Sequence, residues 1–353
     1  MEGVVVVRVG GEIGIKSRPV RRDYEQRLLK YLKERLREKG VPFSEIWRVA
    51  GRIYIKTGEP IVASRLASKI FGISSASPGQ MTTSRLDDIG RVAVMMSKEF
   101  APGSFAVRCR RVGSHPYTSQ EAAAKVGEAI LAARPDLTVD LDSPGNEIFI
   151  EIRDESSVIY TEEFRGPDGF PLGTQDPVVG VIDEAFESVA ASWCLMKRGS
   201  PVLAAVFGPD GVVSDRTEKN LAVLSEWSTG APLKAAVFPC EAPSPLLQLA
   251  LASYCCKAKG LAAVVSGMPV PSLEFLSELR AKINDSAVLF PLAALESGTI
   301  EDWARLMGID TKTKYRNPKS IDLGVEPEAT LVEAIAKKSF EAQVREDGSI
   351  LPL

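Results

Sequence analysis

The chain is almost without histidine, since His115 is the only one among 353 residues. This excludes a metal centre built from several histidines and disfavours a Ser-His-Asp catalytic site. Cysteine is scarce as well: the five residues form an odd set with no framework spacing, so a disulfide-built secreted fold is not predicted. The composition favours a reducing compartment and a cytoplasmic location.

Long apolar runs are also missing. The longest, around residues 260–270, is interrupted by Ser266, Gly267 and Pro269, whereas a membrane-spanning helix needs about 20 apolar residues. The N-terminus carries Glu2 where a signal peptide carries basic residues. We therefore expect no membrane association and no export signal, in a chain long enough for two or three domains.

The net charge of −3 is unevenly distributed along the chain. Residues 1–56 carry a net charge of +7, whereas residues 175–353 carry −6. A basic N-terminal module on an acidic body indicates a polyanionic partner at the N-terminal end. A solvated helix face rich in lysine and arginine explains the same pattern equally well.

The first 75 residues have the pattern of a small two-layer α/β module. Valines predict a strand over 4–9, and leucines at helical spacing predict a helix over 19–39. An alternating strand over 52–56 and a helix over 60–71 follow.

A second module follows, in which residues 105–110 alternate in polarity. Phe105, Val107 and Cys109 fall on one face of this strand, and Arg108 and Arg110 on the other. The further elements predicted in this part are a helix over 120–133, capped by Ser119, and strands over 147–153 and 157–164.

Three prolines and three glycines in residues 165–177 predict a linker. Beyond it, short apolar strands alternate with helices, which is typical of a doubly wound, mostly parallel sheet. The predicted strands cover 178–182, 202–207, 262–266 and 287–291, and the helices cover 184–198, 245–259, 273–283, 299–307 and, at the end, 330–345. The whole chain is therefore expected to combine α+β and α/β domains.

Several stretches resemble the tRNA 4-thiouridine synthetases of the ThiI type. Arg8 to Lys16, with Gly11-Glu12-Ile13, resembles the opening motif of that family, with one extra residue after Arg8. The other matching stretches are Phe71-Gly72-Ile73 and Ser119 to Glu128, similar to a THUMP module; Arg165 to Thr174, similar to the link into the ATP pyrophosphatase domain; and Met196 to Gly199, similar to the end of that domain's first helix. Their order and spacing agree over residues 4–310.

The resemblance implies a domain order and an activity. It implies a ferredoxin-like domain (1–75), a THUMP domain (76–166), a linker (167–177), a PP-loop ATP pyrophosphatase-like domain (178–310) and an extension with a helix (311–353). In the family, the first two domains bind the acceptor-stem end of tRNA. The third adenylates a uridine with ATP, and a cysteine passes sulfur to it.

The phosphate-binding loop departs from the family pattern Ser-Gly-Gly-x-Asp-Ser. The matching stretch begins at Ile182 and has no glycine; its degenerate positions are Asp183, Glu184, Ala185, Phe186 and Glu187. We expect its three carboxylates to cap the following helix and to repel a pyrophosphate. The alternative is that they hold Mg²⁺. ATP and magnesium are therefore not expected as cofactors.

The cysteine that carries sulfur in this family is also missing from the matching region of the sequence. The region from Gly308 to Leu323, where the family carries its catalytic cysteine, contains none. The cysteines elsewhere are expected to be buried and inert. Cys240, in a loop, is the less favoured alternative as a reactive thiol. No catalytic residue is assigned.

Basic side chains are the candidates for RNA contacts, because lysine and arginine supply most of the affinity for phosphate. His115, in a loop, is predicted to be solvated, with stacking on a base as the alternative. The candidate RNA-binding residues are Lys16, Arg18, Arg21, Arg22, Arg108, Arg110 and Arg111.

Three functions stay open. The leading one is a tRNA-binding protein without autonomous ATP-dependent thiolation. The second is an active tRNA sulfurtransferase, for 4-thiouridine or thiamine, with an altered ATP site or a partner subunit. The third is a scaffold that binds proteins rather than RNA. A protein partner on the C-terminal domain and a homodimer also stay open.

Overall fold

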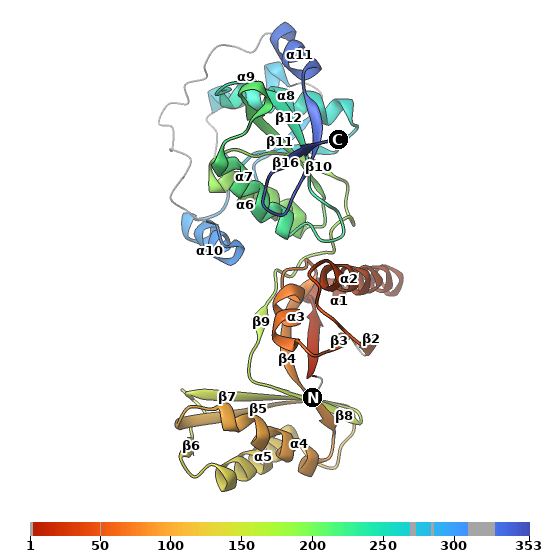
Figure 1. Ribbon diagram of the computed structural model, residues 1–353, viewed down its shortest axis with the longest axis vertical. Helices are drawn as coiled ribbons and strands as arrows, with labels where there is room; N and C mark the ends of the chain where they lie inside the picture. The colour runs from red at the N-terminus through yellow and green to blue at the C-terminus, as the bar shows by residue number, and fades with distance from the viewer. Residues whose placement is uncertain (1–2, 50, 269–272, 284–285, 310–328) are drawn as a thin grey trace. The chain divides into compact units, whose positions relative to one another are not determined.

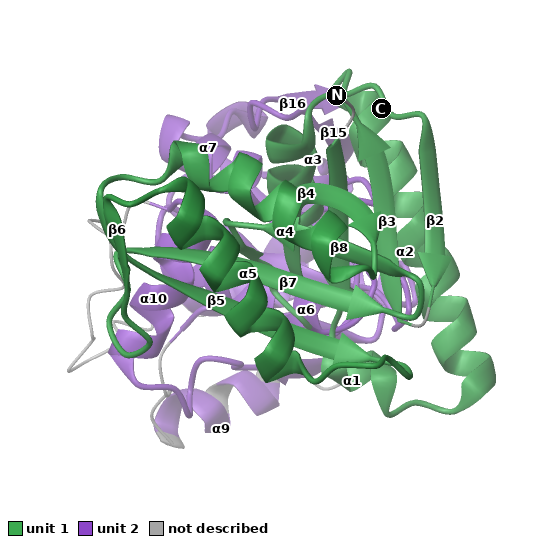
Figure 2. Ribbon diagram, turned by 90° about the horizontal axis from the view of Figure 1, so that it is seen from below, with its two compact units in different colours: residues 1–168 green, residues 169–353 purple. Residues whose placement is uncertain are grey.

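A computed structural model describes residues 3–49, 51–268, 273–283, 286–309 and 329–353. The chain divides into two compact units, residues 1–168 and 169–353 (Figure 2), which we describe separately. Within the described part, no helix is long and apolar enough to cross a membrane.

Unit 1 is built on one nine-stranded sheet, with strand order β2-β3-β1-β4-β8-β7-β5-β6 and with β9 paired to β4 (Figure 1). Its strands are β1 (Gly3–Val9), β2 (Glu45–Val49), β3 (Arg52–Thr57), β4 (Ile73–Thr83), β5 (Gly103–Val112), β6 (Leu137–Val139), β7 (Asn146–Arg153), β8 (Ser156–Tyr160) and β9 (Phe164–Arg165). The long strand β4 pairs with β1 over residues 73–79 and with β8 over residues 79–83. It therefore joins two modules into a single sheet.

The helices of unit 1 cover one face of this sheet. They are α1 (Gly11–Gly14), α2 (Arg18–Glu38), α3 (Pro60–Ala67), α4 (Leu86–Met96), the 3-10 turn η1 (Ser97–Glu99) and α5 (Ser119–Ala133). In Figure 2, α5 lies over β5, and α4 lies next to it, beside β4 and β8. Ile89, Val126 and Ile130 from these helices pack against Ile148 and Ile150 of β7 in one buried cluster.

The opposite, helix-free face is shared by both modules. Val4 and Tyr54 from the first module form a buried cluster with Val158 and Tyr160 from the second. The Tyr160 ring stacks on that of Phe149, with centroids 5.2 Å apart. Side chains two residues apart on a strand share a face, so Arg8, Arg52 and Glu151 continue this same face beyond the apolar cluster. These charged side chains therefore lie in a largely buried part of the helix-free face.

Unit 2 is a doubly wound sheet with strand order β14-β13-β10-β11-β12-β15-β16. Its strands are β10 (Val178–Val181), β11 (Val202–Gly208), β12 (Lys234–Pro239), β13 (Ala263–Val265), β14 (Ala287–Leu289), β15 (Phe340–Val344) and β16 (Ile350–Pro352). Pairing is parallel from β14 through β12, and β15 joins β12 antiparallel. The first four strands are apolar because helices cover both of their faces.

Helices pack on both faces of this second sheet. They are α6 (Phe186–Lys197), the 3-10 turn η2 (Pro209–Gly211), α7 (Asp215–Glu226), α8 (Pro245–Ala258), α9 (Leu273–Lys282), α10 (Ser297–Met307) and α11 (Ala329–Lys337). On the α6 side, the buried Trp193 ring meets Trp227 edge-on, with centroids 5.5 Å apart, and lies 5.9 Å from Trp303 of α10. On the other side, Leu251 of α8 packs with Phe275 of α9.

The predicted strands and helices of unit 2 are confirmed, but the prediction omitted α7 and β12, and the predicted terminal helix is wrong in its second half. Helix α11 ends at Lys337, and the chain then forms β15, paired with β12. Ala342 and Val344 are buried while Glu341 and Gln343 are exposed, which is the period of two expected of a strand. Residues 310–328, which include most of the segment between the last two helices, lie outside the described residues.

Three predicted boundaries need correction. The helix predicted over 60–71 ends at Ala67, and the strand predicted over 157–164 is two strands, because β8 ends at Tyr160 and β9 pairs separately with β4. The cap of α5 is Thr118 rather than Ser119. Its hydroxyl accepts the Glu121 N–H, and the Glu121 carboxylate accepts the Thr118 N–H, which makes a capping box.

Replacing Gly267 with alanine should destabilise unit 2. A Cβ at this position would lie 2.4 Å from both the Glu187 carbonyl carbon and the Ser188 nitrogen, so the backbone has to move. We expect the free energy of unfolding to fall by about 1–3 kcal/mol, measured by urea denaturation followed by tryptophan fluorescence. Gly298→Ala in α10, where a Cβ meets nothing within 4 Å, is the control and should be neutral or slightly stabilising. Unchanged stability of G267A would contradict this close packing.

Candidate nucleic-acid interface

A buried carboxylate organises the charged part of the helix-free face. Glu151 is only 6% exposed. Its Oε1 accepts hydrogen bonds from Arg52 Nε (2.7 Å) and Arg153 Nε (2.8 Å), and its Oε2 lies 3.3 Å from Arg8 Nη2. Three guanidinium groups from β1, β3 and β7 thus surround the one negative charge of Glu151, so that positive charge exceeds negative charge around this residue.

The surroundings keep Glu151 ionised. Burial by itself would raise the pKa of the Glu151 carboxyl, but the charges of Arg52, Arg8 and Arg153 and the hydrogen bond from Arg153 outweigh it, so that the pKa is lowered. Burial lowers the pKa of the Arg52 guanidinium in spite of Glu151, although an arginine stays protonated at neutral pH.

Arg8 connects four strands of the sheet. Its Nη1 donates to the hydroxyls of Ser75 (3.1 Å) and Ser77 (3.0 Å) on β4. Its guanidinium carbon lies 4.8 Å from the centre of the Tyr160 ring on β8, a cation–π contact. Nη1 also lies 3.4 Å from Glu163 Oε2. Arg8 is 8% exposed as a residue, and its buried Nη2 makes no hydrogen bond despite the ion pair with Glu151.

A cavity of about 880 Å³ opens beside Arg8, and we call it the arginine cavity. Its walls include the aromatic rings of Phe149 and Tyr160 and the carboxylate of Glu163. Its basic lining residues are Arg8, Arg108, Arg110 and Arg165. Four guanidinium groups against one carboxylate make the cavity suited to an anion with several charges.

Two of the predicted RNA-binding residues lie in this cavity. Arg108 and Arg110 point to the helix-free face, as the alternation of the strand predicts. Arg108 Nε binds Glu147 Oε1 at 2.9 Å, and Arg110 is exposed. Arg111 is not a lining residue, since it points to the opposite face of β5, where its Nη1 donates to the Gly113 carbonyl oxygen (3.0 Å) and lies 3.3 Å from His115 Nδ1.

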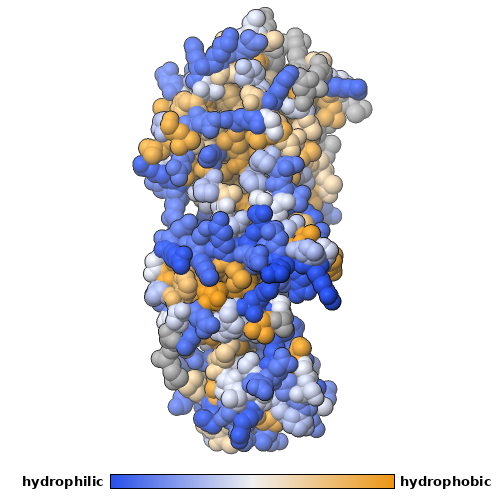
Figure 3. Space-filling view, turned by 90° about the vertical axis from the view of Figure 1, so that its right-hand side faces the viewer, coloured by the Kyte–Doolittle hydropathy of each residue, from blue (hydrophilic) through white to orange (hydrophobic). Residues whose placement is uncertain are grey.

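The other predicted residues lie at the start of α2 and do not line the cavity. Lys16, Arg18 and Arg22 are exposed, whereas Arg21 Nε binds the buried Glu25 carboxylate at 2.9 Å. This pair offsets the unfavourable position of a cation at a helix N-terminus. Hydrophilic side chains cover much of the molecular surface at the level of α2 in Figure 3.

Two lining arginines were not among the predicted site residues. Arg8 is the single charged residue in a strand of buried valines. This sequence pattern indicates that Arg8 has a partner of opposite charge, because a charge in a buried strand needs one. Arg165 lies at the beginning of the stretch predicted as a linker. The cavity lining comes from β1, β4, β5, β7, β8, β9 and the start of α5, which are far apart in sequence.

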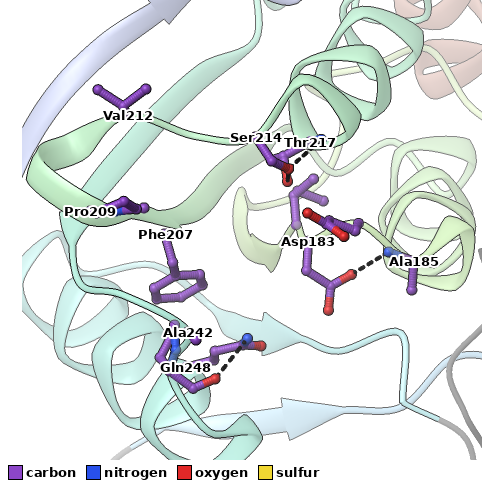
Figure 4. Close-up of a pocket in the computed structure, with 13 residues that line it drawn as sticks. Asp183, Ala185, Phe207, Pro209, Val212, Ser214, Thr217, Ala242 and Gln248 are labelled. Carbon is purple, nitrogen blue, oxygen red and sulfur yellow. Dashed lines mark hydrogen bonds between the residues drawn. The ribbon is translucent and has the colours of Figure 1, made fainter.

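Unit 2 has its own pocket, of about 490 Å³, at the carboxyl ends of β10, β11 and β12 (Figure 4). This edge is where open α/β sheets bind ligands. The pocket contains the segment predicted as a degenerate PP-loop, with Ile182, Asp183, Glu184 and Ala185 among its lining residues, and Phe207 lies opposite.

Side chains near this pocket accept hydrogen bonds from the backbone N–H groups of its loop. The Ala185 N–H donates to Asp183 Oδ1 at 2.9 Å (Figure 4), and the Asp183 N–H donates to Ser188 Oγ at 3.3 Å. The predicted capping of α6 by three carboxylates needs correction. The cap position is Ala185, without a side-chain cap; the Asp183 carboxylate accepts the Ala185 N–H, Glu184 is exposed, and Glu187 lies in the first turn of α6.

None of the five cysteines forms a disulfide. Burial raises the pKa of Cys109 and Cys255 to about 11 and that of Cys194 to about 12. Burial also raises the pKa of Cys256 and of Cys240, the loop cysteine after β12. Because the thiolate is the reactive form, these side chains are poor nucleophiles at neutral pH.

The two modules of unit 1 match known domain families. The ThiI ferredoxin-like domain matches residues 4–77, and the THUMP domain matches residues 84–162. The chain is thus a THUMP protein. Along the sequence, a ferredoxin-like module precedes the THUMP domain and a doubly wound α/β unit follows it.

Curated relatives and solved structures extend the similarity to unit 2. A "Probable tRNA sulfurtransferase" of Methanosarcina acetivorans is 28% identical over 86% of this chain and 81% of its own length. One of Saccharolobus solfataricus is 34% identical, but the match spans 65% of this chain and 61% of that protein. The chain belongs to the THUMP-containing tRNA 4-thiouridine synthetase (ThiI-type) family.

The solved structures agree in fold. The crystal structure of PH1313 from Pyrococcus horikoshii has a TM-score of 0.71 and 31% identity, and the match covers 87% of this chain and all of PH1313. A 4-thiouridine synthetase, solved as an RNA complex with bound ATP, has a TM-score of 0.74 over 97% of this chain and 99% of its own. Its identity of 21% supports a shared fold alone.

Removing the charge of Glu151 should destabilise unit 1. Glu151→Gln keeps the shape but leaves three arginines without their buried counter-charge, so we expect a loss of about 3–5 kcal/mol at neutral pH. The pKa of Glu151 is lowered on folding. The stabilisation by its charge is therefore present above the unfolded pKa of about 4.3 and is lost as pH falls through the folded value.

Urea denaturation from neutral to acidic pH measures this difference, which should shrink toward acid. Glu147→Gln is the control, because its carboxylate is 38% exposed and binds Arg108, so the cost should stay below about 1 kcal/mol. Equal stabilities of E151Q and the unsubstituted chain at neutral pH would show that the network contributes nothing.

Proposed function

We propose that this chain binds tRNA through the arginine cavity of unit 1. The observation that carries the proposal is the set of four arginines around one cavity whose lining comes from both modules of unit 1. Phosphate contacts with arginine supply most of the affinity of RNA-binding proteins. The names of the relatives, which are probable tRNA sulfurtransferases, support tRNA as the nucleic acid.

The shape of the cavity favours a single-stranded segment over a duplex. Arg8 is buried at its inner wall, and a rigid double helix presents its phosphates only on a convex surface. A flexible end or loop can enter and bring successive phosphates to Arg8, Arg108 and Arg110. Recognition of this kind depends on charge and shape and needs no contact to particular base edges.

We propose further that unit 2 does not carry out ATP-dependent thiolation by itself. The residues at its pocket do not fit a triphosphate. Phosphate loops need small residues and unused backbone N–H groups, whereas here the N–H groups of Asp183 and Ala185 bind side chains of the chain itself. The Asp183 carboxylate takes the position of an anion at the loop, and Glu184 adds a second negative charge.

An active tRNA sulfurtransferase is the second candidate, and the printed names of the curated relatives favour it. It requires either ATP bound in a different manner in the pocket of unit 2 or a partner subunit that supplies this step. It also requires a sulfur carrier, and burial raises the pKa of the most loop-like cysteine, Cys240. The binding of ATP separates the two candidates.

Binding to unfractionated tRNA should depend steeply on salt, and substitution of the cavity arginines should weaken it. For the double variant R108Q/R110Q we expect at least about tenfold lower affinity. The slope of log affinity against log salt should become shallower by about 1.4, that is, about 0.7 for each lost phosphate contact to a single strand. Fluorescence anisotropy at several salt concentrations measures both quantities.

Arg91→Gln is the matched control, because Arg91 is an exposed residue of α4 that pairs with Asp88 outside the cavity. Its affinity for tRNA should stay unchanged. The proposal is wrong if the unsubstituted chain shows no salt-dependent affinity for tRNA, or if R91Q and R108Q/R110Q behave alike.

Calorimetric titration with ATP and Mg²⁺ should give no heat of binding, because the loop offers carboxylates where a triphosphate needs N–H donors. The control is a parallel titration of the same preparation with tRNA, which shows that the protein is folded and active in binding. Micromolar affinity for ATP would overturn our interpretation of Asp183 and Glu184 and would make the sulfurtransferase the leading candidate.

A further inference from the structure

Among the described residues that line the arginine cavity, Glu163 alone is acidic. It lies between β8 and β9, and its Oε2 is 3.4 Å from Arg8 Nη1. Its side chain is 42% exposed, whereas that of Arg8 is 9% exposed. A half-exposed carboxylate therefore contacts a buried guanidinium, at the wall of a cavity whose other charged lining residues are arginines.

The two carboxylates on Arg8 differ in how firmly they are held. Glu151 is buried and also binds Arg52 and Arg153, so removing it would leave several charges without a partner. Glu163 is half exposed and approaches Arg8 from the cavity side. Water can take over the solvation of Glu163 when it leaves, which makes this ion pair weak and replaceable.

We propose that Glu163 occupies the position on Arg8 that a phosphate of the RNA takes in the complex, and that it thereby determines how selectively the cavity binds RNA. This inference rests on the proposed function. A carboxylate and a phosphate both present oxygens that match the donors of a guanidinium. Binding is then an exchange of anions: the phosphate enters, and the Glu163 carboxylate moves into solvent.

The exchange explains why a carboxylate lies in an anion-binding cavity. Without it, the inner end of the cavity would attract any small anion. With Glu163 in place, an isolated anion has to displace a tethered carboxylate for a single contact. An RNA strand compensates for that displacement through additional contacts to Arg108, Arg110 and Arg165. Glu163 thus favours polyanions that reach several arginines at once.

The test compares Glu163→Gln with Glu162→Gln by fluorescence anisotropy on unfractionated tRNA. Both substitutions change the net charge equally, but Glu162 is outside the cavity lining. We expect E163Q to bind about two- to fivefold more tightly, the range set by one exposed ion pair, and E162Q to match the unsubstituted chain, because exposed charges are screened by salt.

A second readout uses inorganic phosphate as a competitor. Phosphate should displace tRNA from E163Q at lower concentration than from the unsubstituted chain, because no carboxylate then approaches Arg8 Nη1 from the cavity, while Glu151 still pairs with Nη2. Glu163→Ala provides a second variant with the same expected direction, and a thermal melt verifies that each variant is folded. Equal affinities of E163Q, E163A and E162Q, with unchanged phosphate competition, would overturn the inference.

Failure of this inference and failure of the proposed function give different results. If R108Q/R110Q weakens tRNA binding while E163Q leaves it unchanged, the cavity binds RNA but Glu163 is not its regulator. If none of these variants changes tRNA binding, RNA binding through the cavity is itself wrong.

Discussion

The attraction between one buried carboxylate and three guanidinium groups determines how unit 1 can be built. Glu151 lies where strands of two different modules bring arginines to one face of a sheet. In a place of low dielectric, such charges are tolerated only when they are paired. Because the pairing is incomplete, positive charge remains and extends into the arginine cavity. The same interaction thus holds the two modules in register and makes their shared face attractive to a polyanion.

Carboxylates have opposite roles at the cavity of unit 1 and at the pocket of unit 2. In unit 1, the chain supplies fewer carboxylates than guanidinium groups and leaves room for an external anion. In unit 2, the Asp183 carboxylate accepts a hydrogen bond from the Ala185 N–H in the loop before α6. We propose from this contact that the loop does not receive a triphosphate, whereas the cavity of unit 1 receives an external polyanion.

Local patterns were sufficient for most elements and for part of the site. The alternation around Cys109 placed Arg108 and Arg110 on the correct face, because side-chain direction in a strand depends only on position. Arg8 and Glu151 could not be paired in the same way, because their contact depends on the order of strands in the folded sheet. The hairpin beginning at Phe340 was missed because a short alternating run next to a helix is too brief for its period to be separated from that of the helix. The carboxylates before α6 were recognised, but which of them would bind a backbone N–H depends on loop geometry that the sequence does not specify.

The long strand β4 has a consequence for the independence of the two modules. Its first part pairs with β1 and its last part with β8, so neither module closes its sheet without it. A chain divided between residues 77 and 84 would expose an unpaired edge on at least one fragment, and such edges associate with other chains. The ferredoxin-like and THUMP domains, although separate as sequence families, are therefore joined here in one continuous sheet, and a cut within β4 should destabilise both.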